Sequence, residues 1–156
     1  MTDHQRQELL QAEYFHLHTS IANFDERALT IKGWSVTVGM AGIAAALVEK
    51  APVLMLLSAL ASLLFWLVEG LWKAFQQAHY RRIRQIERYF AGEWPAQKKF
   101  HVGHITGSWH YSWSQNKSGT LWRIMVGRPH VYLPHAVVLV AGVALWVVDL
   151  IYRLVP

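Results

Sequence analysis

The sequence contains no cysteine, and charged residues make up only 16% of its 156 residues. The lack of cysteine excludes disulfide bonds and thiolate chemistry, although it says little about the compartment. Glycine-rich phosphate loops, nucleophile elbows, zinc-protease motifs and paired carboxylates are also missing. We therefore predict that the protein is not an enzyme and has no cofactor.

Charge is scarcest in three long apolar runs. Ile31–Val48 contains one charged residue, Lys32, whereas Ala51–Val68 and Val131–Val148 contain none. A helix that crosses the hydrocarbon of a bilayer needs about 20 predominantly apolar residues. We therefore predict an all-α integral membrane protein with three transmembrane helices. The first run follows about 28 residues that include several acids, and it lacks a convincing cleavage site, so we expect it to be retained rather than cleaved as a signal peptide.

The basic residues predict the orientation of the chain in the membrane. Most of them lie between the second and third runs, whereas the short connection at 49–52 has one charge of each sign. The positive-inside rule then places the N-terminus and the middle segment in the cytoplasm and the C-terminus on the outside. This explains the net charge of +5 by topology, so we do not expect nucleic acid to be the main ligand.

Two polar segments beside the first two runs have helical periodicity. Apolar residues recur at spacings of three and four in both segments, which is the pattern of a helix with one packed face. In the first segment they are Leu10, Tyr14, Leu17, Ile21, Phe24 and Ala28, and in the second they are Phe75, Ile83, Ile86 and Phe90, with His79 on the same face. Because neither segment contains proline, we expect the first two spans to continue into the cytoplasm as a long antiparallel hairpin.

These patterns divide the chain into six parts. We predict a cytoplasmic amphipathic helix at 1–28, transmembrane helices at 29–49 and 51–72, a cytoplasmic helix at 73–91, an aromatic and histidine-rich cytoplasmic segment at 92–130, and a third transmembrane helix at 131–153.

A turn at Lys50-Ala51 would place residues at equal distances from it side by side. Lys32 would then meet Glu69 at the inner membrane edge, and Glu13 would meet Arg88. A pair of opposite charges lowers the cost that either charge has in the membrane. The alternative is that both faces are solvated and that Lys32 extends to the headgroups on its own.

Charged residues near the membrane interior are the candidates for pore or gating groups. They are Lys32, Glu69 and Asp149. Intramembrane acids are functional candidates by default, but structural pairing is an alternative, because Asp149 has Arg153 four residues on.

Small residues on the first two spans are candidates for close helix packing. They are Ser35, Gly39, Gly42, Ala46, Ser58 and Ser62. Small residues at a spacing of four allow helices to approach closely in a membrane, within one chain or between chains. Three spans enclose very little space, so a pore would require several copies.

The segment 92–130 is rich in aromatic residues. Trp109, Tyr111 and Trp113 alternate at a period of two, and turn residues at 115–119 precede an apolar stretch at 121–126, so we predict a β-hairpin. These three aromatics, with Arg123 and Arg128, are candidates for contacting a nucleotide or a partner protein. The alternative is a small cap on the cytoplasmic helices. The nearby histidines lack a completing ligand set, so we expect no metal.

One part of the chain also resembles a known group of proteins. The residues Glu13-Tyr14, Ile21, Phe24-Asp25-Glu26-Arg27 and Ile31-Lys32-Gly33-Trp34-Ser35 run directly into the first span and the short turn. Over roughly residues 8–91 this pattern resembles the SLATT group of small bacterial membrane proteins, which are effectors of anti-phage defence. The third span and the aromatic segment depart from the two-span pattern.

The resemblance implies a homo-oligomeric pore or membrane-disrupting effector in the bacterial inner membrane, with a partner protein or a nucleotide messenger as its trigger. The alternative function is a non-conducting anchor that recruits a soluble partner through the heptad stripe.

Overall fold

The structure is a computed structural model that describes residues 2–95, 100–115 and 118–154. These residues form no strand and five helices: α1 (Asp3–Val48), α2 (Val53–Phe90), α3 (Ile105–Gln115), α4 (Ser118–Gly127) and α5 (Pro129–Leu154). The helices α1, α2 and α5 are long and apolar enough to cross a membrane. The predicted helical architecture with three candidate spans is therefore confirmed.

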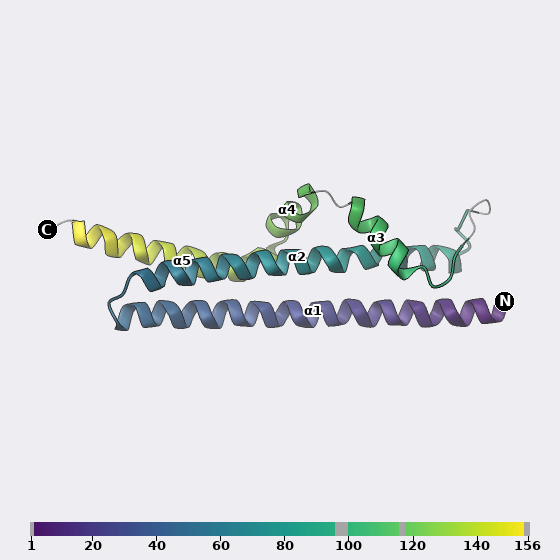
Figure 1. Cartoon of the computed structure of the whole chain (residues 1–156), viewed down its shortest axis with the longest axis horizontal. Coiled ribbons are helices and arrows are strands. Elements are labelled where there is room, and N and C mark those ends of the chain that lie inside the picture. Colours follow the sequence, from purple (N-terminus) through teal and green to yellow (C-terminus); the bar gives the residue numbers. More distant parts are fainter. Residues whose placement is uncertain (1, 96–99, 116–117, 155–156) are drawn as a thin grey trace.

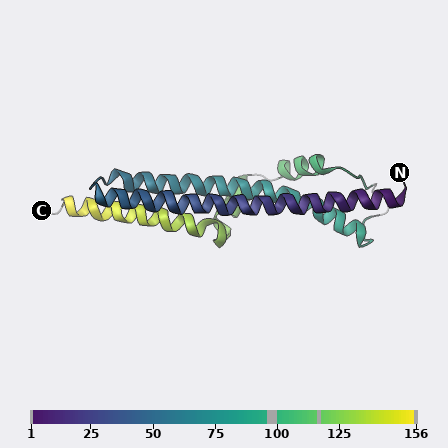
Figure 2. The ribbon, with the colours of Figure 1, turned by 90° about the horizontal axis from the view of Figure 1, so that it is seen from below.

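The two longest helices form an antiparallel hairpin (Figures 1 and 2). α1 begins with a capping box, in which the Thr2 hydroxyl accepts from the Gln5 backbone and the Gln5 side chain accepts from the Thr2 backbone. The chain reverses between the two helices with Lys50 in the left-handed region, at a φ of 51°. Both helices are continuous across the positions where we expected membrane segments to give way to cytoplasmic ones, because their buried faces continue without interruption.

The open end of the hairpin, α1 up to residue 28 and α2 from residue 73, is here called the polar half. It has its own apolar core, which consists of Leu10, Leu17, Ile21, Ile83, Ile86 and Phe100. Five of these residues belong to the two heptad stripes, and Phe100 covers them from the segment before α3. Phe90, at the end of the second stripe, is 51% exposed and does not join this core.

The closed end of the hairpin, here called the apolar half, packs against α5 (Figure 1). Glycines allow the close approach. A Cβ atom on Gly39 of α1 would lie 2.2 Å from Cγ1 of Val138, and one on Gly142 of α5 would lie 2.7 Å from the backbone oxygen of Met55. Small residues therefore bring the three long helices together within one chain.

The predicted β-hairpin is wrong. The residues expected to form its strands lie in α3 and α4 instead, and residues 116 and 117 of the expected turn lie outside the described residues. Trp109 and Trp113, four positions apart, share one face of α3, and both stack on Phe75 of α2 with ring centroids 6.1 and 4.6 Å away. A period of two over three residues also fits a helix, and the long-range contact with α2 decides between the two.

Candidate functional site

A cluster of polar side chains is buried where α1, α2 and α5 meet in the apolar half. Glu69 of α2 lies at its centre, with a side chain that has no exposed surface. Its Oε1 lies 2.7 Å from Nζ of Lys32 on α1, and its Oε2 lies 2.9 Å from Nε2 of His135 on α5. One carboxylate therefore joins all three candidate spans.

Two serines complete the cluster. Nδ1 of His135 lies 2.7 Å from Oγ of Ser35, and that oxygen lies 3.2 Å from Oγ of Ser62. The Ser62 hydroxyl donates to the backbone oxygen of His135 at 2.8 Å. Ser35, Ser62 and His135 are all fully buried. Each ring nitrogen of His135 thus faces an oxygen, and the hydroxyls link α1 and α2 to α5.

Hydrogens can be assigned to the contacts of His135, Ser35 and Ser62 in two ways that differ by one proton. A single proton between Glu69 and Nε2 of His135 leaves Nδ1 as an acceptor for the Ser35 hydroxyl, and the Ser35–Ser62 contact then has no donor, because Ser62 donates to the backbone of His135. With a further proton on Nδ1, the ring donates to Ser35, and the Ser35 hydroxyl is free to donate to Ser62. The two assignments differ in the direction of one hydroxyl, that of Ser35.

The depth of the cluster places it inside the apolar layer. Lys32 and Glu69 each lie about 24 Å along their helix from the closed end of the hairpin, at about 1.5 Å per residue. The hydrocarbon of a bilayer is about 30 Å thick. If the closed end of the hairpin lies at one surface of a bilayer, Glu69 and His135 lie within the hydrocarbon near its other edge, and the Lys32 side chain there is 17% exposed. Ionisable groups at such depth are costly and are functional candidates.

Lys32 and Glu69 form the pair that we predicted from their equal distances from the turn. Asp149, the third charged candidate, lies elsewhere. Its Oδ2 is 2.7 Å from Nε of Arg153, one turn further along α5, and both side chains are partly exposed. The structure therefore places Lys32 and Glu69 in the cluster and leaves Asp149 out of it.

The predicted small residues divide between two roles. Ser35 and Ser62 belong to the cluster. The other four, Gly39, Gly42, Ala46 and Ser58, form packing surfaces, and a Cβ atom on Gly42 would lie 2.2 Å from Oγ of Ser58.

His135 is the member of the cluster that we did not predict. The available signal was its position, since it is the only histidine in the run Val131–Val148. We looked in the apolar runs for formally charged residues and counted histidine as neutral, so we did not select His135. An ionisable side chain inside a candidate span marks a functional position even without a formal charge.

The candidates for contacting a ligand or partner do not converge on one site. Trp109 and Trp113 pack on Phe75, whereas Tyr111 faces Arg81 of α2, whose guanidinium carbon lies 4.0 Å from the ring centroid. Arg123 is exposed on α4.

Arg128, the remaining candidate, lies between α4 and α5 beside Gln77 of α2. It is therefore separate from the aromatic residues of α3.

The predicted Glu13–Arg88 pair is wrong. Glu13 binds Arg82 instead, with Oε1 at 2.6 Å from Nε and Oε2 at 3.0 Å from Nη2. The backbone N–H of Gly103 also donates to this carboxylate at 3.1 Å. Arg82 lies on the buried face of α2, whereas Arg88 lies on its exposed face. The helix face, rather than distance from the turn alone, therefore decides the partner.

A second ion pair crosses the polar half close to the apolar layer. Nζ of Lys73 contacts Oδ1 of Asp25 and lies 3.1 Å from Oε1 of Gln76. The hydrogen bond from Lys73 holds the pKa of Asp25 below its ordinary value, although partial burial opposes this shift. Within the described residues, no group of three or more His, Asp or Glu side chains is arranged to hold a metal ion.

Comparison with protein-family models, curated proteins and solved structures found no match. The Lys32–Glu69–His135 cluster is the most informative feature of the chain, because it places ionisable groups in contact inside an apolar layer.

Proposed function

We propose that the protein is a channel-like effector that assembles from several copies in a bacterial inner membrane. The observation that carries this proposal is the fully buried Glu69, which contacts both other spans through Lys32 and His135. A lipid anchor has no need for charges at this depth, where they are costly. A pore subunit can use them as a lock that holds its three spans together until the trigger arrives.

Within the described residues, the three spans of a single copy pack directly against one another. Val138 packs on Gly39, and Gly142 lies against Met55 and Ala59, so the centre of the three-helix unit is filled. The conducting path therefore lies between copies, and the polar cluster acts as a lock within each copy.

The outer face of α1 is the best candidate for the contact between copies. It presents Gly33, Thr37, Ala41 and Ala44, which are small and exposed at spacings of four and three, beside the exposed Met40 and Val48. The exposed faces of α2 and α5 present leucines and valines, such as Leu60 and Val140, which suit lipid. Small residues favour helix association in membranes, so α1 would line the assembly.

In this arrangement the polar half lies in the cytoplasm, where the positive-inside rule places it. It would receive the trigger and pass it along two continuous helices to the cluster. The resemblance to SLATT-like effectors supports the same arrangement of a paired-span unit with cytoplasmic helices.

Ion flux from liposomes that contain the purified protein tests the proposal. Thr37→Leu on the outer face of α1 should reduce the flux, whereas Val140→Leu on the exposed face of α5 should leave it unchanged. Glu69→Gln weakens the lock and should raise the basal flux. A protein that stays monomeric in native membranes, or that shows no flux even as Glu69→Gln, would contradict the proposal.

A specific feature favours the alternative, a non-conducting anchor. At the tip of the polar half, a hollow of about 670 Å³ is lined by residues that include Tyr14, Phe15 and Phe90, and the latter two are 59% and 51% exposed. Such a surface suits a soluble partner. If the protein is an anchor, Phe15→Glu should release a copurifying partner, and no variant should affect ion flux.

A further inference from the structure

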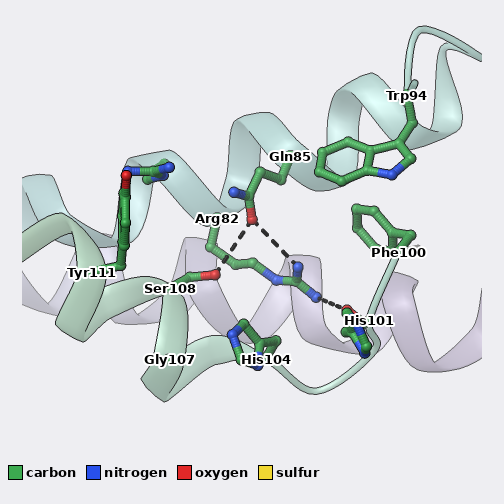
Figure 3. Close-up of a pocket in the computed structure, with 10 residues that line it drawn as sticks. Arg82, Gln85, Trp94, Phe100, His101, His104, Gly107, Ser108 and Tyr111 are labelled. Atoms are coloured by element: carbon green, nitrogen blue, oxygen red, sulfur yellow. Dashed lines mark hydrogen bonds between the residues drawn. The ribbon is translucent and has the colours of Figure 1, made fainter. Parts of the chain in front are cut away.

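A pocket in the polar half lies between α2 and the beginning of α3 (Figure 3). Its volume is about 280 Å³. A neighbouring hollow of about 310 Å³ shares Arg81, Gln85 and Trp94 with it and adds Arg84 and Arg88. Together the two hollows reach the size of small-molecule sites, which is about 300–1,000 Å³.

Hydrogen bonds fix the side chains at the base of this pocket. Arg82, only 3% exposed, is fixed by Glu13 and donates through Nη2 to the backbone oxygen of His101 at 2.8 Å. Oε1 of Gln85 lies 3.5 Å from Nη1 of Arg82 and accepts from Ser108 at 3.4 Å (Figure 3). The amide nitrogen of Gln85 has no partner among the described residues, and it remains available as a donor.

The rim of the pocket carries uncompensated positive charge. Arg81, Arg84 and Arg88 recur along α2 at spacings of three and four. Within the described part of the chain, no Asp or Glu is within ion-pair distance of any of the three, and none lines either hollow. Guanidinium groups bind phosphoryl oxygens through paired hydrogen bonds. The charge therefore favours a phosphorylated ligand.

Aromatic rings lie at both ends of the pocket. Tyr111 stacks against Arg81 at one end, with 4.0 Å from the guanidinium carbon to the ring centroid. Trp94 and Phe100 meet edge to face at the other end, with centroids 4.8 Å apart (Figure 3). Rings beside a basic rim favour stacking with a planar group.

Lipid headgroups are a poor fit for this position. Arg81 lies about 18 Å along α2 beyond Glu69, which is itself near the edge of the hydrocarbon. The headgroup layer adds only about 5–8 Å on each side. A ligand for this pocket therefore comes from the aqueous phase.

We infer that this pocket binds a small soluble organic phosphate that carries a planar ring, of the chemical class of a mononucleotide. The phosphoryl group lies against Arg81 and Arg84, the ring lies against Tyr111, and Gln85 donates to the ligand. The pocket differs from the set expected from the sequence, because only Tyr111 of those residues lines it.

Calorimetric titration of the full-length protein in lipid nanodiscs tests this inference with adenosine monophosphate, adenosine and inorganic phosphate as probes. We expect adenosine monophosphate to bind more tightly than either of the other two. Arg84→Gln should weaken its binding about tenfold, as for loss of a hydrogen bond to a charged group. Tyr111→Leu should weaken adenosine monophosphate and adenosine but leave inorganic phosphate unchanged.

Arg123→Gln is the matched control, because it removes the same charge from an exposed position on α4. It should leave the binding of adenosine monophosphate unchanged. The inference is overturned if adenosine monophosphate binds no more tightly than inorganic phosphate, or if Arg84→Gln and Arg123→Gln have equal effects.

The role of this ligand as a trigger rests on the proposed function, whereas its binding does not. Binding of adenosine monophosphate without any ion flux would contradict the channel and leave the pocket intact. Ion flux without binding would contradict the pocket and leave the channel intact.

Discussion

Oε1 of Glu69 lies 2.7 Å from Nζ of Lys32, and the two residues lie at equal distances from the turn that joins their helices. The same carboxylate contacts His135 through its other oxygen. Glu69 therefore contacts two basic side chains at once, and its removal leaves both of them without a carboxylate partner.

We expect Glu69→Leu to destabilise the protein by about 3–5 kcal/mol, the usual cost of removing one member of a buried ion pair. Lys32→Leu combined with Glu69→Leu should recover part of this loss, since it removes an unpaired charge. Thermal unfolding in detergent measures both. Asp149→Leu is the control, because its partly exposed pair with Arg153 contributes at most about 1 kcal/mol. Equal losses for Glu69→Leu and Asp149→Leu would argue against a buried pair.

Replacing two glycines on α1 with alanine should change the stability of the protein in opposite directions. A Cβ on Gly39 meets Val138, so Gly39→Ala should cost about 1–3 kcal/mol through overpacking. Gly39→Ala together with Val138→Ala should recover part of this loss. A Cβ on Gly33 meets nothing within 4 Å, so Gly33→Ala should stabilise the helix by up to about 1 kcal/mol. Unfolding of the three variants in detergent gives the comparison, and a similar effect at both glycines would contradict the packing of α5 on α1.

The partner of Glu13 can be identified by substituting the two arginines separately. Arg82→Leu leaves a buried carboxylate unpaired and should cost about 3–5 kcal/mol. Arg88→Leu removes an exposed side chain and should change the stability by less than about 1 kcal/mol. Chemical denaturation measures the difference. A larger loss of stability from Arg88→Leu than from Arg82→Leu would support the Glu13–Arg88 pair instead.

The Asp25–Lys73 pair should make the stability depend on pH only in acid. Because Lys73 lowers the pKa of Asp25 in the folded protein, the stabilisation is fully present above the unfolded pKa, about 3.9, and is lost as the pH falls through the lower folded value. The Asp25 side chain is 53% exposed, so screening should keep the effect below about 1 kcal/mol.

Asp25→Asn isolates this contribution. The wild type should be more stable than the variant at pH 7, and the two should converge below about pH 4. Asp25→Asn made in a Lys73→Gln background is the control, because the hydrogen bond that lowers the pKa of Asp25 is then absent and the gap at pH 7 should shrink. A stability gap that grows in acid would have the wrong sign for this pair.

Periodicity allowed much of the fold to be predicted. The long apolar runs and the heptad stripes have the period of helices over many turns, so the three candidate spans and the hairpin followed from the residues. The segment 105–127 was mispredicted because Trp109, Tyr111 and Trp113 are too few to distinguish a strand from a helix. The stacking of Trp109 and Trp113 on Phe75, far away in the sequence, decided for the helix.

By itself, the sequence determined the three apolar helices, the position of the turn and the meeting of Lys32 with Glu69. These follow from composition, helical period and distance along the chain, all of which are local quantities. Only the tertiary structure decided that His135 completes the cluster and that Arg82 is the partner of Glu13. Both depend on which face of a helix is buried against a distant segment, and that is settled by packing between helices.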